Sequence, residues 1–387
     1  MNNKEYSHEN NVTLIKGGKA YFNLLSKLIE DANDTIYIQS YIFNEDDTGI
    51  SIAKSLRQAA KRNVHTYVLV DGIASQSLSK KFIQSLLNDG VNFKPFMPLF
   101  QCNDYYFGRR MHQKVVCIDQ THSLVGGLNI ADRYNDLPNK TAWLDFAVYV
   151  KGDVSVSLAD YCRRIWNGYP YDDEKYNFEN LSPVIQLNTD EFCDVRMRRN
   201  DWVWHKNEIS NSYIEMMHNA KNNITILCSY FIPGKALRRL MANAVKRGIS
   251  IKVITTNKSD VKIAKYAERW LYDWLLRNKI ELYEYKTRIL HGKLAICDNE
   301  WFTIGSYNIN NISTYAALEL NLDIKNKNKT KELLGFVNEI IDVDCIKVTK
   351  EYHRKSKNII KQFSRWLSYQ FIRMVFKMLT FYFKRKI

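Results

Sequence analysis

The sequence predicts an α/β fold made of two similar domains, and a repeated order of elements carries this prediction. The first half alternates helix, strand, helix and strand, over residues 23–32, 35–43, 52–62 and 64–70. The second half repeats this order, over residues 213–220, 223–232, 236–247 and 249–254. Because strands and helices alternate, we expect a largely parallel sheet in each half, flanked by helices.

Each predicted element follows from its own local pattern. The helices are amphipathic, and the strands are short runs rich in β-branched and aromatic residues, such as the run that starts at Thr35. In the first half, Arg62 and Asn63 end a helix directly before a strand. Arg247 and Gly248 do the same in the second half, which supports the duplication.

The boundary between the halves is predicted near residue 190. Residues 167–194 are rich in acidic residues and contain two prolines, a composition that is typical of a connector. We therefore expect a first domain over residues 1–190, a second domain over 191–350 and a C-terminal segment over 351–387.

The charge and the cysteine content of the chain indicate which partners and which compartment suit the protein. The chain of 387 residues carries 56 Lys and Arg against 41 Asp and Glu, which gives a formal net charge of +15. Nucleic acid or an anionic lipid surface would complement this charge, although the charge can also serve solubility alone. The seven cysteines include no CxxC pair, so we expect reduced cysteines and a protein that faces the cytosol. We expect neither a signal peptide nor an ordinary transmembrane helix.

Each half contains one copy of the same motif. The first copy begins with His112-Gln113-Lys114 and the second with His291-Gly292-Lys293. In both copies an Asp follows the His by seven residues, a Gly follows the Asp by seven, and an Asn follows that Gly by three. One copy would be a weak signal, but two copies with identical spacing at equivalent places of a repeat are a strong one.

The motif predicts a site for a phosphate group. The His and Lys of each copy lie two residues apart on a predicted strand, so their side chains point to the same side. A turn of small residues lets the Asn approach the same spot. Two such sets, related by a pseudo-two-fold axis, would place one imidazole on either side of a phosphorus atom, as in-line displacement requires.

The doubled pattern resembles that of the phospholipase D superfamily, and more narrowly that of bacterial cardiolipin synthases. The resemblance extends over residues 12–345, and its supporting stretches include Tyr41-Ile42-Phe43, Val70-Asp71-Gly72-Ile73, Trp143-Leu144-Asp145 and Ser229-Tyr230-Phe231-Ile232-Pro233. It implies one composite active site at the interface of the two domains. It also implies a two-step mechanism through a phosphohistidine, with neither a metal nor a cofactor.

The resemblance assigns roles to the motif residues. It implies that His112 is the nucleophile and His291 the general acid and base, although the sequence does not show which way round they work. The groups expected around the phosphate oxygens are Lys114, Lys293, Asn129, Asn308 and Ser306. The first copy departs from the second at Gly127, which stands where the second has Ser306.

Four carboxylates complete the predicted site. Asp119 and Asp298 belong to the catalytic motif, but their spacing suggests that they brace the fold rather than touch phosphate. The resemblance implies that Glu319 and, in the first half, Asp145 orient the imidazoles and fix their tautomers.

The C-terminal segment predicts contact with a membrane. Residues 358–387 contain no Asp or Glu. On a helix, one broad face would carry Lys361, Arg365, Arg373, Lys377 and Lys384. The other face would carry Phe363, Leu367, Phe371, Met374, Met378 and Phe381. We expect a basic amphipathic helix that holds the protein peripherally on the cytoplasmic face of an anionic membrane. The alternative is a terminal helix packed on the protein core.

The predicted function is transfer of a phosphatidyl group from one phosphatidylglycerol to another, which yields cardiolipin and glycerol. Hydrolysis to phosphatidic acid is the main alternative, because the sequence does not identify the acceptor, and phosphatidylethanolamine remains a possible donor. A nuclease is a weaker alternative, supported by Tyr105, Tyr106, Arg109 and Arg110 and by Arg196, Arg198 and Arg199. No metal-ligand spacing occurs among the remaining histidines, which are His8, His65, His122, His205, His218 and His353.

Overall fold

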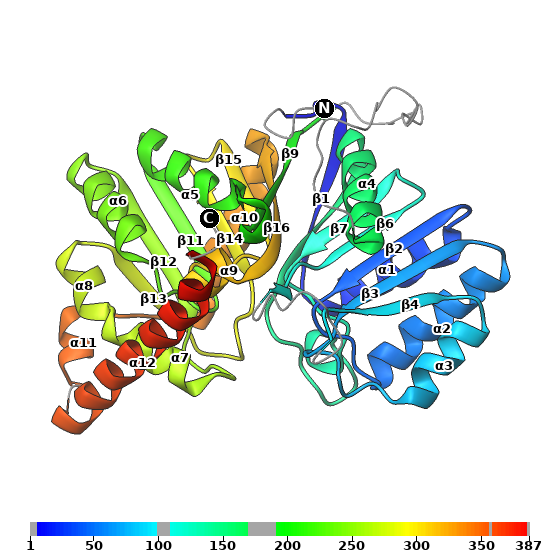
Figure 1. The fold of residues 1–387 in the computed structure, drawn as a ribbon. Helices are drawn as coiled ribbons and strands as arrows, with labels where there is room; N and C mark the ends of the chain where they lie inside the picture. Colours follow the sequence, from blue (N-terminus) through cyan, green and yellow to red (C-terminus); the bar gives the residue numbers. More distant parts are fainter. Residues whose placement is uncertain (1–5, 99–108, 169–190, 356–357, 385–387) are drawn as a thin grey trace.

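The chain forms two α/β units side by side, in a computed structural model that describes residues 6–98, 109–168, 191–355 and 358–384 (Figure 1). The strands of the first unit are β1 (Asn10–Lys16), β2 (Thr35–Ser40), β3 (His65–Asp71), β4 (Asn92–Phe96), β5 (Arg110–Met111), β6 (Val115–Ile118), β7 (His122–Gly126) and β8 (Phe146–Gly152). Its helices are α1 (Gly18–Asp31), α2 (Asp47–Lys61), α3 (Lys80–Asn88) and α4 (Asp153–Asn167).

The second unit begins at β9, and the predicted boundary near residue 190 lies outside the described residues. Its strands are β9 (Asp194–Asp201), β10 (Lys206–Asn207), β11 (Asn223–Cys228), β12 (Ser250–Thr256), β13 (Glu281–Tyr285), β14 (Lys293–Cys297), β15 (Trp301–Gly305), β16 (Ala317–Lys325) and β17 (Cys345–Lys347). Its helices are α5 (Glu208–Asn219), α6 (Lys235–Lys246), α7 (Lys262–Trp270), α8 (Tyr272–Arg277), α9 (Asn311–Tyr315) and α10 (Lys327–Asp344). The C-terminal segment follows as α11 (Lys350–Lys355) and α12 (Ile359–Lys384).

The two sheets have the same strand order, which confirms the duplicated α/β fold. The first sheet runs β1-β8-β7-β6-β2-β3-β4, and the second runs β9-β16-β15-β14-β11-β12-β13 with β10 and β17 added at its edges. The prediction of largely parallel sheets is wrong, because among the described strands parallel pairing occurs in β2-β3-β4, in β11-β12-β13 and in the short contact of β5 with β16. Two isolated parallel bridges, Phe43 with Ile130 and Leu144 with Leu290, add to these. Hairpins join β6 to β7 and β14 to β15, and a hairpin can join only antiparallel strands.

A shared core lies between the two sheets and holds the halves together. It combines Leu158 of α4 and Val148 of β8 with Leu320 of β16 and Leu333 of α10, all of them buried. The outer faces of the sheets have separate cores, covered by α1, α2 and α3 in the first half and by α5, α6 and α8 in the second. The surface between the halves is therefore a packed interior, and a site there can be held rigidly.

Helix α12 packs along α7 (Figure 1). Its buried side carries Tyr369 and Ile372, which join Ile232 and Leu271 in one apolar cluster. The prediction that Arg365 lies on an open basic face is wrong, because this side chain turns toward the protein body and is only 5 % exposed.

The apolar face predicted for α12 points outward where the structure describes it. Its exposed members are Phe363, Leu367, Phe371, Met374 and Met378. The side chains of Lys377, Phe381 and Lys384 lie outside the described set. Within the described chain, no helix is long and apolar enough to cross a membrane.

Candidate active site

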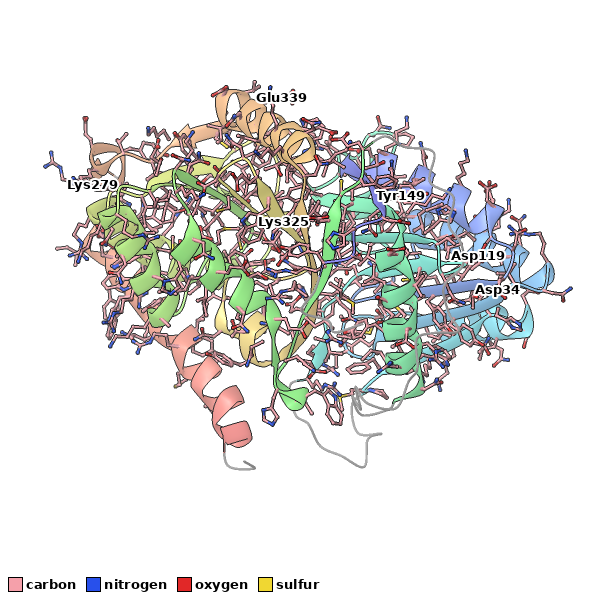
Figure 2. The ribbon with its side chains drawn as sticks, turned by 90° about the horizontal axis from the view of Figure 1, so that it is seen from above. Asp34, Asp119, Tyr149, Lys279, Lys325 and Glu339 are labelled. Carbon is pink, nitrogen blue, oxygen red and sulfur yellow. The ribbon has the colours of Figure 1, made fainter. Side chains whose placement is uncertain are left out.

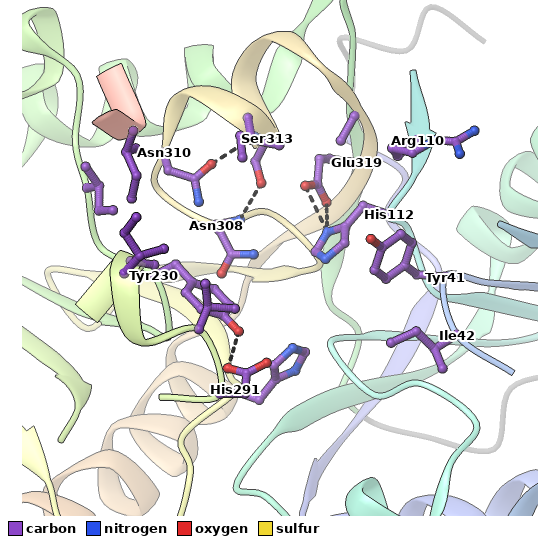
Figure 3. A pocket seen from close by; sticks show the side chains of 18 of the residues that line it. Tyr41, Ile42, Arg110, His112, Tyr230, His291, Asn308, Asn310, Ser313 and Glu319 are labelled. Atoms are coloured by element: carbon purple, nitrogen blue, oxygen red, sulfur yellow. Dashed lines mark hydrogen bonds and ion pairs between the residues drawn. The ribbon is translucent and has the colours of Figure 1, made fainter. Parts of the chain in front are cut away.

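A pocket of 460 Å³ contains residues from both copies of the motif (Figure 3). His112 and Asn129 enter it from the first half, and His291 and Asn308 enter it from the second. The two imidazoles therefore share one cavity, although their motifs lie far apart in the sequence.

Each motif histidine is anchored on the backbone of the opposite half. The N–H of His112 donates to the carbonyl oxygen of Leu318 at 3.0 Å, where β5 pairs with β16. The N–H of His291 donates to the carbonyl oxygen of Leu144 at 2.7 Å. These two carbonyls occupy equivalent places in the repeat, so the anchoring follows the pseudo-two-fold symmetry of the halves.

The buried carboxylates next to these carbonyls extend the same crossed arrangement, in which each half of the protein holds the histidine of the other half. His112 Nδ1 lies 2.9 Å from both carboxylate oxygens of Glu319, and His291 Nδ1 lies 2.6 Å from Asp145 Oδ2. Each carboxylate therefore serves the imidazole of the other half. A hydrogen bond from Nδ1–H to a carboxylate fixes the tautomer and leaves the Nε2 lone pair for chemistry.

Burial sets the charge state of both imidazoles. It lowers the pKa of His112 despite the opposing charge of Glu319, and nearby Lys114 adds to the lowering. Burial, followed by the charge of Lys293, lowers the pKa of His291 to about 4, although Asp145 opposes this. Both rings are therefore neutral at pH 7 before an anion binds, which suits a nucleophile or a general base.

The two motif lysines are buried directly beneath the histidines. Lys114 Nζ donates to the carbonyl oxygen of His112, and Lys293 Nζ donates to that of His291. Burial lowers the pKa of Lys114 to about 7 and also lowers that of Lys293. An arriving phosphate would favour the charged form of both lysines. Neither Lys114 nor Lys293 is among the residues that line the pocket, so their charge lies behind the histidines.

The two asparagines are oriented by partners within their own halves. Asn129 Oδ1 accepts from the N–H of Ile42 at 3.0 Å, and Asn308 Oδ1 accepts from the Ser229 hydroxyl at 2.9 Å. Because each amide oxygen is already engaged, the group that either side chain can offer to a phosphate oxygen is its NH₂.

Ser306 supports a carboxylate and does not line the pocket. Its hydroxyl donates to Glu319 Oε2, and it also accepts from the N–H of Leu320 at 3.1 Å. The predicted role of Ser306 in phosphate binding is therefore corrected. A Cβ atom on Gly127, the equivalent residue, would lie 2.3 Å from Asp145 Oδ1, so the absence of a side chain at this position makes room for that carboxylate.

Asp119 and Asp298 lie in the hairpin turns and not in the pocket, so they are not catalytic groups. Asp119 accepts from the N–H groups of Asn33, Asp34 and Thr35, each at 2.9 Å. Figure 2 shows it beside Asp34, well away from Lys325 of the second half. Asp298 likewise accepts from the three N–H groups of residues 221–223, at 2.7 to 2.9 Å. Each Asp therefore fastens its motif hairpin to the start of a neighbouring strand, as its spacing suggested.

Aromatic residues contact both imidazoles, and no motif in the sequence predicted this role for them. The ring of Tyr41 meets His112 edge-on at 4.9 Å, and the ring of Tyr134 meets His291 in the same manner at 5.1 Å. Tyr230 donates to Asp260 Oδ1 at 2.5 Å in the same pocket. The repeat could have indicated Tyr41 and Tyr230, because each follows a Ser where an equivalent strand ends: Ser40 is the last residue of β2, and Ser229 comes directly after β11.

Most of the basic residues that supported the nuclease alternative form ion pairs within the protein. Arg196 contacts Glu215 and Asp323, Arg199 contacts Glu208, and Arg109 contacts Asp201. Arg198 is buried and lies 3.5 Å from Asp323. Tyr105 and Tyr106 lie outside the described residues, whereas Arg110 lines the pocket. Within the described ranges, no group of three or more His, Cys, Asp and Glu side chains is placed to hold a metal ion.

Both halves match the family described as cardiolipin synthase, phospholipase D-like domain, over residues 25–151 and 213–341. The chain belongs to this family. Cardiolipin synthase B of Escherichia coli O6:H1 is 31% identical over 352 residues, which cover 88% of this chain and 82% of that protein. The cardiolipin synthase of Halalkalibacterium halodurans is 30% identical over 342 residues, with coverages of 88% and 67%.

A solved structure extends the family likeness to the whole fold. The phosphatidylserine synthase of Haemophilus influenzae Rd KW20 has a TM-score of 0.71, with 14% identity and 97% of both chains covered. At this identity the likeness concerns the fold alone. The family match confirms the predicted resemblance, and this member of the cardiolipin synthase family is a phosphatidyltransferase-type enzyme.

Proposed function

We propose that the protein transfers a phosphatidyl group from one phosphatidylglycerol to a hydroxyl of a second, so that cardiolipin forms and glycerol leaves. The observation that carries this proposal is a single pocket with two imidazoles, each held by a buried carboxylate, next to an apolar wall. The names of the relatives with 30% or more identity point in the same direction.

In the first step, Nε2 of His112 attacks the phosphorus atom of the donor lipid. The bond from phosphorus to the glycerol headgroup breaks, and His291 gives its proton to the departing oxygen. The anionic phosphodiester favours the protonated form of His291, which offsets the lowering of its pKa by burial and by Lys293. The products of this step are free glycerol, a phosphatidyl-His112 and a neutral His291.

In the second step, His291 removes the proton from a hydroxyl group of the second phosphatidylglycerol. That oxygen attacks phosphorus, the phosphorus–nitrogen bond to His112 breaks, and cardiolipin forms. We assign Lys114 and Lys293 to the charge that builds up on the phosphate oxygens, and the NH₂ groups of the two motif asparagines to hydrogen bonds with them.

We further propose that the protein works peripherally on the cytoplasmic face of an anionic membrane. Exposed apolar side chains surround the pocket, among them Val261, Ile263 and Ile312 beside the outer face of α12. The net charge of +15 favours an anionic lipid surface over a neutral one. Nucleic acid is less well matched, because the candidate basic side chains are mostly buried in ion pairs.

The first experiment is analysis of the lipid products. Purified protein is incubated with phosphatidylglycerol vesicles without added metal, and the products are identified by mass spectrometry. We expect cardiolipin and glycerol from the wild type and from His218→Ala, a matched control on the exposed surface of α5, and neither product from His112→Ala. Phosphatidic acid alone would replace the transferase by a phospholipase, and no lipid product would refute a phosphatidylglycerol donor.

Trapping the covalent intermediate shows which of the two histidines is the nucleophile. We expect His291→Ala to accumulate a covalent phosphatidyl adduct at His112, which intact-protein and peptide mass spectrometry can locate. An adduct at His291 in the His112→Ala variant, with none at His112 in the reciprocal variant, would reverse the roles.

Vesicle flotation tests the membrane surface separately. We expect Phe363→Asp with Leu367→Asp to weaken binding to vesicles that contain phosphatidylglycerol, and Ile214→Asp on α5 to leave it unchanged. Ile214 is a suitable control because it is also an exposed apolar residue but lies on another helix. Equal binding by all three proteins would refute docking through α12.

A further inference from the structure

Helix α12 forms part of the catalytic pocket itself. Phe371, Ile372 and Val375 line the pocket together with Ile263 of α7 and Ile312 of α9. Figure 3 shows a turn of α12 in pale red beside Asn310, on the side of the pocket away from His112 and Tyr41. The pocket therefore has a polar wall that carries the chemistry and an apolar wall made largely by the C-terminal segment.

The apolar wall continues to the surface of the molecule. Ile372 is 9 % exposed and is held in the cluster beneath α12, whereas Phe371 is 46 % exposed although it also lines the pocket. Leu367 and Met374 lie three to four residues from Phe371, so they share its side of the helix, and both are exposed. Apolar side chains of α12 thus extend from the pocket to the outer face of the helix, through Phe371, Leu367 and Met374.

We infer that this wall, which we call the α12 wall (Ile263, Ile312, Phe371, Ile372 and Val375), binds the acyl chains of the phospholipid whose phosphate meets the histidines. The inference rests on the proposed function, because it takes the ligand to be a glycerophospholipid. It goes further by assigning the C-terminal helix to substrate selection and not only to attachment.

The size and the polarity of the pocket both favour this occupant. A free headgroup or a nucleotide would leave the α12 wall against polar atoms, whereas acyl carbons next to it remove apolar surface from water. A volume of 460 Å³ lies toward the small end of ligand pockets, about 300–1,000 Å³. It has room for the phosphate, the glycerol and the first part of the chains. The rest of each chain then extends along the outer face of α12, so the donor need not leave the bilayer completely.

Binding of soluble lipid homologues tests the inference without turnover. The His112→Ala protein is titrated calorimetrically with dihexanoyl- and dioctanoyl-phosphatidylglycerol, both below their micelle concentrations. The longer homologue has four more CH₂ groups, and each one that is fully buried strengthens binding about fourfold. Because the wall covers the chains on one side only, we expect the longer homologue to bind about tenfold more tightly.

Two double variants distinguish the contribution of the α12 wall from that of the rest of the helix. We expect His112→Ala with Phe371→Ala to lose most of the tenfold preference and to bind the shorter homologue within about twofold of His112→Ala. We expect His112→Ala with Phe363→Ala to keep the preference, because Phe363 is exposed on the same helix but does not line the pocket.

A chain-length preference that survives Phe371→Ala, or that is absent from the parent protein, would overturn the inference. So would equal effects of Phe371→Ala and Phe363→Ala, because these would report general attachment. The outcome is independent of the acceptor: a wild type that releases phosphatidic acid refutes the transferase, yet leaves the chain-length measurement valid.

Discussion

Replacing Asp145 by Asn should invert the tautomer of His291. Asp145 Oδ1 accepts from the N–H of Phe146 at 2.8 Å, and an Asn can keep that bond only through its carbonyl oxygen. The NH₂ group then takes the place of Oδ2, which lies 2.6 Å from His291 Nδ1. Because an NH₂ group donates, Nδ1 must accept, and the ring proton moves to Nε2, where the lone pair is needed.

The expected loss is large for Asp145→Asn and small for Glu319→Gln. General acid–base catalysis contributes about 10²–10⁴ in rate, so we expect kcat to fall by about 10³ when the tautomer is wrong. This corresponds to about 4 kcal/mol of transition-state stabilisation. Both oxygens of Glu319 lie 2.9 Å from His112 Nδ1, and the Ser306 hydroxyl next to them can rotate. A Gln can therefore turn its carbonyl oxygen toward Nδ1, and we expect a loss of about tenfold.

The assay is the initial rate of cardiolipin formation in mixed micelles of phosphatidylglycerol and detergent, with folding checked by thermal melting. Asp145→Asn with more than a tenth of the wild-type kcat would refute the tautomer argument. A loss in Glu319→Gln equal to that in Asp145→Asn would show that the missing charge, and not the orientation of the amide, controls the rate.

Three further predictions concern the motif turns, the glycine behind Asp145 and the response to acid. Asp119→Ala and Asp298→Ala should each lower the free energy of unfolding by about 2 kcal/mol, because three backbone N–H groups lose their acceptor, while kcat per folded molecule stays within about twofold. Urea titrations measure the free energy of unfolding, and initial rates measure kcat. A fall in kcat without a fall in the free energy of unfolding would contradict this prediction. Gly127→Ser should reduce kcat at least tenfold, since its Cβ would lie 2.3 Å from Asp145 Oδ1, and a crystal structure with that carboxylate unmoved would disprove the reason. The pKa of His291 is about 4 in the folded protein and about 6.5 in the unfolded chain, so only the unfolded chain takes up a proton between these values. The free energy of unfolding of the wild type, measured by urea titration, should therefore decrease as the pH falls from 6.5 to 4. We expect a smaller decrease for His291→Gln over the same range. An equal decrease in both proteins would contradict the lowered pKa of His291.

The parts of the site that depend on local pattern could be predicted from the sequence. The repeat identifies His291 and Lys293 as the equivalents of His112 and Lys114. The prediction that each pair lies on one strand is wrong, because residues 112–114 lie between β5 and β6, and His291 precedes β14. The bracing role of Asp119 was also predicted from spacing, although its partners, residues 33–35, lie 84–86 residues away in the sequence and were not predicted.

The parts that depend on docking between the halves could not be predicted in the same way. The partner of His112 lies 207 residues away, and no local pattern specifies which imidazole each carboxylate serves. The helical periodicity of α12 separated two faces correctly but did not show that Arg365 would turn inward, because that depends on the surface of α7. Ser306 was misassigned because the motif gives its place in the chain and not the direction of its side chain.

The crossed carboxylates also have a consequence for the timing of synthesis. A nascent chain that has passed His112 has neither the carbonyl oxygen of Leu318 nor the carboxylate of Glu319 to hold that ring. At about 5–20 residues per second, the ribosome needs roughly 10–40 s to add the 207 residues between His112 and Glu319. Throughout that interval the growing polypeptide carries an unsupported imidazole, so it has no working phosphoryl-transfer centre until both halves have been made.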